Sequence, residues 1–269
     1  MRVSCIIPTF DRPDMLRETL RSVYSQTHPV DEIIVVDNGT KAAVVPSEYA
    51  SHVKVVPLPP RSGVSYARNA GAAIAVHEIL AFLDDDDLWN PRYIELIMKA
   101  FADGADCVVS RLDQMKDGVV TSYKNADAQL TIENLLVFNP GITGSNIALK
   151  KSVLISLGGF DPNLPTSEDK SLMIELLRHG AHIRTLPDNQ AIQRMHTGDR
   201  LTDPNTLATG IALFTKKYRA LMNWQTYFFN RRKFFRLRVD DGTRFAYLGL
   251  LIFALLYRLA RVIADVERK

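Results

Sequence analysis

The sequence has few cysteines, little excess charge and no long hydrophobic run, and each scarcity excludes a class of protein. Only two of its 269 residues are cysteines, Cys5 and Cys107, and both lie in apolar runs that predict buried strands. So few thiols exclude a disulfide-stabilised fold and are typical of a cytosolic protein. The formal net charge of +3 implies no polyanionic partner, so nucleic acid is not an expected ligand.

Neither end of the sequence predicts a membrane-spanning or secretory segment. The hydrophobic run Phe245–Tyr257 holds thirteen residues without a charge, whereas a helix that spans a bilayer needs about 20. Five mildly apolar residues separate Arg2 from Pro8, which is too short for the apolar centre of a secretory signal. We therefore expect a cytoplasmic protein.

Through the first half of the sequence, short apolar runs alternate with segments of helical periodicity. This order predicts an α/β fold in which helices flank a mostly parallel sheet. Asp11 is placed to cap a helix that has Pro13 in its first turn. The other predicted helices span 65–76, 91–100 and 167–178, and the predicted strands are Val3–Ile7, Glu32–Val36, Val53–Val56, Leu80–Leu83 and Asp106–Val109.

Polar residues follow three of these predicted strands. They are Pro8–Asp11, Asp37 with Asn38, and Asp84–Asp87. Ligands of open parallel sheets bind beyond the carboxyl ends of the strands. We therefore expect these three groups, which are distant in the sequence, to meet at one edge of the sheet and to form an active site.

The four consecutive carboxylates of Asp84–Asp87 are the strongest chemical signal. Two unit charges about 4 Å apart repel by roughly 1 kcal/mol in water and by more near a protein surface. A bound cation would offset this repulsion, and oxygen-only ligands favour Mg²⁺ or Mn²⁺. The alternative is a solvated acidic turn after a strand.

Several motifs follow one another along the sequence: Ile6–Arg12, Ile33–Thr40, Gly63–Gly71, Phe82–Pro91, Gly158–Asp161 and Glu168 with Asp169. Taken in this order, they resemble the motifs of family 2 glycosyltransferases. The resemblance covers about residues 1–200 and implies a GT-A fold, which is a Rossmann-like sheet flanked by helices. It also implies inverting, metal-dependent transfer from a nucleotide-diphosphate sugar, such as a UDP-sugar, to a glycan or lipid-linked acceptor of the cell surface.

The resemblance assigns the donor side of this site. Asp37 is expected to accept hydrogen bonds from the nucleobase or ribose, and the alternative is an aspartate that only ends a strand. Asn38 replaces the second acid that is usual there. Arg68, among small helical residues, is expected to be a free cation that reaches the pyrophosphate, and a plain exposed arginine is the alternative. The other donor-binding candidates are Pro8, Thr9, Asp11, Asp84 and Asp85, and Asp86 is the expected metal ligand.

The acceptor side follows from the later motifs. Asp169 is the expected general base, because inversion by single displacement needs a carboxylate beside the acceptor hydroxyl. Glu168 is its closest competitor, and an acidic helix start is the structural alternative for both. Gly144 and Ser145 either line the acceptor side or form a plain turn. His196 either closes over the donor phosphates, binds metal or is structural.

The composition changes after residue 215. We expect a GT-A domain over 1–215 and a helical, basic segment over 216–269, in which Arg231–Arg238 interleaves cations with aromatic residues. This segment is expected either to contact an anionic membrane at its cytoplasmic face, to pack on the catalytic domain or to form a dimer.

Two other functions remain open from the sequence. The first is a sugar-nucleotide nucleotidyltransferase, although Pro8–Asp11 stands where such enzymes carry a glycine-rich basic loop. The second is a non-catalytic protein that binds a nucleotide sugar with the same fold.

Overall fold

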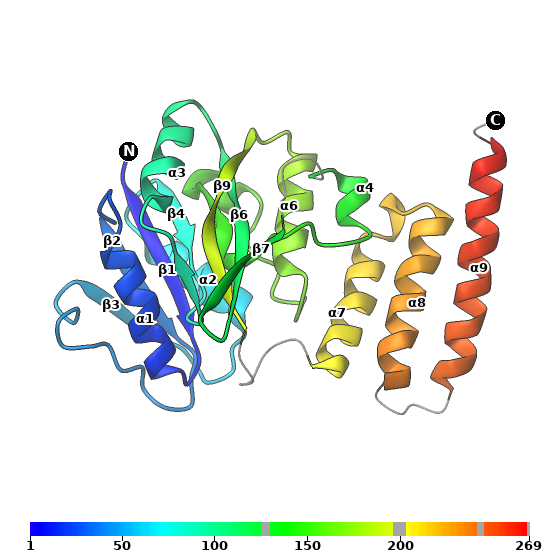
Figure 1. Ribbon diagram of the computed structural model, residues 1–269, viewed down its shortest axis with the longest axis horizontal. Helices are drawn as coiled ribbons and strands as arrows, with labels where there is room; N and C mark the ends of the chain where they lie inside the picture. The colour runs from blue at the N-terminus through cyan, green and yellow to red at the C-terminus, as the bar shows by residue number, and fades with distance from the viewer. Residues whose placement is uncertain (125–129, 196–202, 241–244, 268–269) are drawn as a thin grey trace.

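The computed structural model describes residues 1–124, 130–195, 203–240 and 245–267. A sheet of nine strands forms its centre, in the order β3-β2-β1-β4-β8-β6-β9-β5, with β7 paired to β6 (Figure 1). The strands are β1 (Val3–Thr9), β2 (Glu32–Asp37), β3 (Val53–Pro57), β4 (Ile79–Phe82), β5 (Asp87–Trp89), β6 (Cys107–Lys116), β7 (Val119–Lys124), β8 (Ile147–Lys150) and β9 (Ile183–Arg194). The α-helices are α1 (Pro13–Tyr24), α2 (Val64–Ile74), α3 (Tyr93–Ala102), α4 (Ile132–Leu135), α5 (Lys151–Ser156), α6 (Glu168–Arg178), α7 (Pro204–Lys217), α8 (Trp224–Asp240) and α9 (Ala246–Glu267).

The alternating side chains of β1 divide the hydrophobic core into two layers, one on each face of the sheet. Cys5 and Ile7 belong to the layer that includes α1 and α3. Ile6 belongs to the opposite layer, with residues of α2 and α6. Successive strand residues point to opposite faces, so a strand that is covered on both faces needs an unbroken apolar run. This is why the runs of the first half predicted the strands well.

The predicted α/β fold is confirmed, and its sheet has a parallel half and a mixed half. β3, β2, β1 and β4 run parallel, whereas β8 is antiparallel to both β4 and β6. The long strand β9 was not predicted, because Pro187 and Asp188 interrupt its apolar residues. It pairs with β6 and β5 and brings residues near Arg194 to the start of β5, at Asp87.

The helices α7, α8 and α9 lie side by side at one end of the molecule (Figure 1). α7 belongs to the core, since Phe214 is buried there together with Tyr218 and Met222 just beyond it. α9 packs on α8 through ring contacts that include Phe228 with Phe253 and Phe229 with Tyr257.

The length of α9 corrects an expectation from the sequence. The thirteen-residue run without charge indicated a segment too short to cross a bilayer, but the helix continues through Arg258 and Arg261 for 22 residues in all. Its window Ala246–Ile263 has the length and mean hydropathy of a membrane-spanning helix, and only 6% of that window is buried.

Candidate active site

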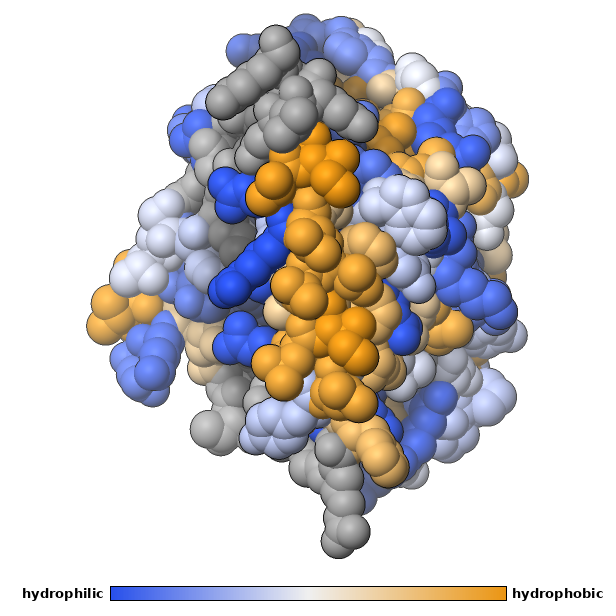
Figure 2. Space-filling model, turned by 90° about the vertical axis from the view of Figure 1, so that its right-hand side faces the viewer, coloured by the Kyte–Doolittle hydropathy of each residue, from blue (hydrophilic) through white to orange (hydrophobic). Residues whose placement is uncertain are grey.

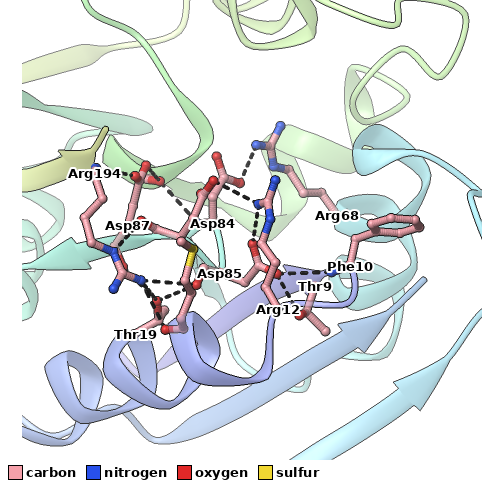
Figure 3. A network of polar contacts seen from close by, with 12 residues as sticks. Thr9, Phe10, Arg12, Thr19, Arg68, Asp84, Asp85, Asp87 and Arg194 are labelled. Carbon is pink, nitrogen blue, oxygen red and sulfur yellow. Dashed lines mark hydrogen bonds and ion pairs between the residues drawn. The ribbon is translucent and has the colours of Figure 1, made fainter. Parts of the chain in front are cut away.

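The acidic loop Asp84–Asp87 follows β4 and contacts the end of the neighbouring strand β1. Asp85 accepts hydrogen bonds from the Thr9 hydroxyl at 2.7 Å, the Phe10 backbone N–H at 3.1 Å and the Arg12 guanidinium at 2.9 Å (Figure 3). The predicted meeting of these strand ends is therefore confirmed. Burial raises the pKa of Asp85 to about 6, although Arg12 opposes the rise. Asp85 and Thr9 are buried and anchor the loop, and their role in donor binding stays a prediction.

Asp87 anchors the other side of the loop. It accepts hydrogen bonds from the Ser145 hydroxyl at 2.5 Å and from the Arg194 backbone N–H at 3.0 Å. Burial, together with the charges of Asp86 and Asp84, raises its pKa well above the ordinary value. Ser145 is itself fully buried, within a 3-10 turn over Gly144–Asn146. It therefore fastens the loop and does not line an open acceptor side.

Two arginines that the sequence analysis did not select complete this support. Arg12, just before α1, also contacts Asp86 at 2.8 Å. Arg194, from β9, donates to the Asp86 carbonyl oxygen at 2.5 Å and forms an ion pair with Glu18. Arg12 stands inside the first motif, so the sequence offered a signal for it. A lone arginine in an unpredicted strand offered none for Arg194.

Asp84 and Asp86 are the carboxylates of the loop that solvent reaches, with side chains 27% and 16% exposed. Together with Asp87 they form a group in which one carboxylate oxygen of each lies within 4.8 Å of the others. Oxygen-only ligands at this spacing fit Mg²⁺ or Mn²⁺. The residues present thus fit the predicted metal. Asp84 and Asp87 join the predicted ligand Asp86 as residues that could hold it.

Arg68, from α2, joins the acidic loop to α6. Its Nη2 donates to Asp84 Oδ1 at 2.7 Å, and its Nη1 donates to Glu168 Oε1 and to Asp169 Oδ1 at 3.0 Å each. Burial alone would lower the pKa of Arg68, but the three carboxylates more than offset this and raise it. The side chain is only 2% exposed, so the expectation of a free cation is wrong for this arrangement. The three carboxylates hold the guanidinium group in place, so it does not extend into solvent.

Gly144 provides the space that Arg68 occupies. A Cβ atom at this position would lie 2.0 Å from Arg68 Nη2, so a side chain there would displace the guanidinium group from its present place. Gly144, predicted to line the acceptor side or to form a turn, thus acts through its lack of a side chain.

Glu168 and Asp169 form the first turn of α6, directly after Ser167, whose backbone has φ +69°. The positive end of the helix dipole favours acidic residues at this place. Asp169 is 15% exposed, and burial and the neighbouring Glu168 raise its pKa while Arg68 opposes the rise. A reachable carboxylate with a raised pKa is suited to accepting a proton.

The loop after β2 lies on the same edge. Asp37 is buried and accepts hydrogen bonds from the N–H groups of Gly39 and Ala43. Asp11 does not cap α1, which begins after Arg12 without a side-chain cap. Its backbone has φ +54°, and its carboxylate instead accepts from Thr40 and the Lys41 N–H.

Two further candidates of the sequence analysis complete the comparison. Pro8 is buried within β1, opposite Val36 of β2. His196 lies outside the described residues. Asn38 carries a feature that was not predicted, because its buried Oδ1 has no hydrogen-bond partner among the residues that the structure describes.

Comparison with known proteins identifies the class. The family model of glycosyl transferase family 2 matches residues 4–157. The chain therefore belongs to glycosyltransferase family 2, as its motifs predicted.

Individual relatives place it within that family. An uncharacterized glycosyltransferase of Haemophilus influenzae is 26% identical over 182 residues, which cover 65% of this chain and 62% of the relative. The chain thus spans less than two thirds of that relative's length. The putative teichuronic acid biosynthesis glycosyltransferase TuaG of Bacillus subtilis is 29% identical over 188 residues, with coverage of 66% and 73%.

The fold is similar to that of a solved structure. The structure of S. aureus TarS 1–349 in complex with UDP-GlcNAc superposes with a TM-score of 0.62 at 16% identity, over 99% of this chain and 92% of that one. The match supports the GT-A fold, and it extends over the C-terminal helices as well.

Proposed function

We propose that this protein transfers a sugar, with inversion at the anomeric carbon, from a nucleotide-diphosphate sugar to a hydroxyl group of a glycan or glycolipid. The observation that carries the proposal is the position of Arg68, whose single guanidinium group contacts both Asp84 of the acidic loop and Asp169 of α6. The loop that would hold the diphosphate and the carboxylate that would accept the acceptor proton are thereby fixed relative to each other.

In this proposal Asp169 is the general base. An inverting displacement needs the acceptor oxygen on the face of the sugar opposite the leaving group, with a carboxylate beside it. Asp169 would remove the proton of the acceptor hydroxyl as the new glycosidic bond forms. Glu168, which is more buried and shares Arg68 Nη1, would help to hold the guanidinium in place.

The charge of the site supports a requirement for a divalent cation. Six carboxylates, those of Asp84–Asp87, Glu168 and Asp169, lie in this region, and five of them pair with the guanidinium groups of Arg12 and Arg68. The guanidinium group of Arg194 instead pairs with Glu18 and with a backbone carbonyl oxygen of the loop. The formal excess of negative charge would repel an anionic diphosphate. Asp84, Asp86 and Asp87 would hold Mn²⁺ or Mg²⁺, which when bound stabilises the charge on the leaving diphosphate.

We propose a UDP-sugar as the donor. The TarS structures in complex with UDP-GlcNAc and with UDP support this choice. We propose Asn38 as a further donor contact, since its buried Oδ1 lacks a partner among the described residues and the residue is next to Asp37. An acceptor atom in this state gains from an N–H donor such as that of a uracil ring.

We propose a role in the synthesis of a cell-surface polysaccharide, on the cytoplasmic side of the membrane. The name of TuaG as a teichuronic acid biosynthesis enzyme supports this context. We also propose a division into a GT-A domain and a C-terminal helical segment. The expected boundary at 215/216 falls inside α7, and Tyr218 and Met222 still pack in the core, so we place the boundary directly after Met222.

The decisive experiment is a thermal-shift panel of UDP, dTDP, GDP, CMP and ATP, each with and without Mn²⁺. A ligand at about 100 times its dissociation constant stabilises the native state by roughly 2.7 kcal/mol. We expect a shift with UDP that requires Mn²⁺ and that is lost in Asp84→Asn combined with Asp86→Asn. A flat panel from folded protein would contradict the proposal.

A second measurement separates transfer from binding. The protein with UDP-GlcNAc and other UDP-sugars should release UDP when a glycan or lipid-linked acceptor is supplied. Metal-dependent binding without any donor hydrolysis or transfer would instead favour a non-catalytic protein that binds nucleotide sugars. The family match does not favour the nucleotidyltransferase alternative.

A further inference from the structure

The outer face of α9 is a continuous stripe of exposed hydrophobic side chains (Figure 2). The opposite face of α9 packs against α8. The two helices are so close that Gly249 of α9 lies against the ring of Phe235 of α8. The residues of the stripe recur at helical spacing and are 45–67% exposed: Leu248, Leu251, Ile252, Leu255, Leu259, Val262 and Ile263. A contiguous apolar surface of this kind in a soluble protein marks an interaction site.

A basic groove runs along one flank of the stripe, between α8 and α9. It has a volume of about 380 Å³ and is lined by Phe229, Leu250 and Ala254 together with Arg232, Lys233 and Arg236. The Arg232 guanidinium lies 5.1 Å from the centre of the Tyr257 ring, which holds it at the groove. Hydrophilic side chains border the stripe in Figure 2.

Two cations of this groove, Arg232 and Arg236, lack acidic counterparts among the described residues. The sequence from Lys216 to Val239 contains eight lysines and arginines and no aspartate or glutamate. No carboxylate among the described residues pairs with Arg232 or Arg236. Arg258 and Arg261 of α9 are exposed near the same flank. The surface is therefore apolar along its centre and positively charged along its edge.

We propose that α8 and α9 together dock this protein on an anionic phospholipid bilayer. α9 lies in the plane of the interface with its stripe among the acyl chains, and Arg232, Arg236 and Arg258 meet lipid phosphates. An apolar face bordered by cations is the pattern of interfacial helices that bind anionic lipid. This inference concerns a surface outside the active site and does not rest on the proposed donor or metal.

A spanning orientation of α9 fits the structure less well than an interfacial one. The window Ala246–Ile263 is long enough to cross a bilayer, but α8 packs along it through Phe228, Phe229 and Phe235. Insertion of α9 would carry the arginines of α8 into the hydrocarbon region, which strongly disfavours charged groups. In the interfacial orientation these groups stay at the level of the head groups.

The charge also distinguishes a bilayer from a second copy of the chain. Two stripes that paired with each other would bring Arg258 and the groove cations of both copies together, with no acidic residue from 245 to 263 to offset them. An anionic bilayer offers both the apolar interior and the opposite charge.

The test is vesicle co-sedimentation of the full chain. Vesicles of phosphatidylcholine with 30% phosphatidylglycerol are compared with pure phosphatidylcholine, at low and at high salt. We expect binding at least tenfold tighter to the anionic vesicles and weakened by salt. Removing one interfacial cation should weaken binding about fivefold, so Arg232→Gln with Arg236→Gln should weaken it on the order of 25-fold. Leu251→Glu with Leu255→Glu should abolish it.

Matched controls lie on distant surfaces. Val76→Glu replaces a hydrophobic residue that is 73% exposed, and Arg92→Gln removes an exposed cation; both should bind vesicles like the wild type. All variants should keep the thermal unfolding of the wild type. The nucleotide thermal shifts should also be unchanged, which separates failure of this inference from failure of the proposed function.

Four results would overturn the inference. The first is no preference for anionic vesicles. The second is binding that the Leu251/Leu255 variant retains. The third is a wild-type chain that does not bind vesicles but is a dimer in sedimentation velocity, together with a Leu251/Leu255 variant that is a monomer. This result would assign the stripe to contact with a second copy of the chain. Resistance of bound wild-type chain to extraction at high pH would indicate a spanning helix and would also contradict it.

Discussion

The edge of the sheet around the acidic loop and the pair α8–α9 are built on opposite plans. At the sheet edge, charged groups are buried and paired, as Arg68 is with three carboxylates from two distant segments. In α8–α9 the apolar groups face outward and several cations have no acidic partner among the described residues. The comparison teaches that a reaction site needs groups fixed by one another, whereas a docking surface leaves its groups for an external partner.

The largest expected effect is on catalysis, and it tests whether the sheet edge is a reaction site. Asp169→Asn should lower the rate of sugar transfer by about 10²–10⁴-fold, because a positioned base contributes that much. The metal-dependent UDP shift should persist, since Asp169 is proposed to act on the acceptor. Glu95→Gln, on the exposed surface of α3, is the control. Turnover close to that of the wild type would exclude Asp169 as the base.

The second effect tests how much the fixed charges contribute to stability. Arg68→Met leaves three carboxylates facing one another without a cation, so the free energy of unfolding should fall by about 3–5 kcal/mol. Chemical denaturation measures this difference. Arg92→Met, which breaks an exposed pair with Glu95, should change stability by no more than about 1 kcal/mol. Equal losses of unfolding free energy in the two variants would show that the buried pairs of Arg68 contribute no more to stability than an exposed pair does.

Lys170, in α6 next to Asp169, gives the stability of the protein a pH dependence. It is buried with its Nζ 3.9 Å from the centre of the Phe214 ring, and burial, with Lys233 nearby, lowers its pKa to about 7. Between this value and the ordinary lysine pKa near 10.4, the unfolded chain binds the extra proton, so stability should rise with pH over that window.

Lys170→Met should remove this dependence. At pH 7 the variant should be more stable than the wild type, and the difference should shrink as the pH rises toward 10. One group contributes at most about 1.4 kcal/mol per pH unit to the slope. Urea denaturation at several pH values measures it. Parallel pH profiles of the two proteins would refute a depressed pKa.

The smallest expected effect is on the stability of variants in the exposed stripe of α9. Leu255→Gln on the exposed stripe should change the free energy of unfolding by less than about 0.5 kcal/mol, whereas Phe214→Ala in the core should cost about 3–5 kcal/mol. Denaturant unfolding without lipid compares them. A large loss for Leu255→Gln would mean that the stripe already has a partner in the protein itself.

The sequence predicted the parallel half of the fold well and the contacts of the site incompletely. Apolar runs mark strands that are covered on both faces, so β1, β2 and β4 and the meeting of their ends followed directly. β9 was missed because its polar residues and Pro187 hide a strand whose place is set by pairing with β6. Arg194 was missed with it.

The role of Arg68 shows a different limit. A motif indicates which residue types belong to a site but not which of them pair with each other. Whether Arg68 is free or paired depends on α6, which lies 100 residues further along the chain at Glu168, and on the absence of a side chain at Gly144. Neither condition can be read from local sequence.

The two cysteines have a practical consequence for studying the outer helix. Both thiols are free and fully buried, and burial raises their pKa far above the ordinary value. Alkylating dyes react with accessible thiolates, so the natural chain should remain nearly unlabelled in its folded state. A single cysteine introduced at an exposed position of α9 would therefore be the only residue that the dye labels. The emission of the attached fluorophore would report directly how deep that position lies in a bilayer.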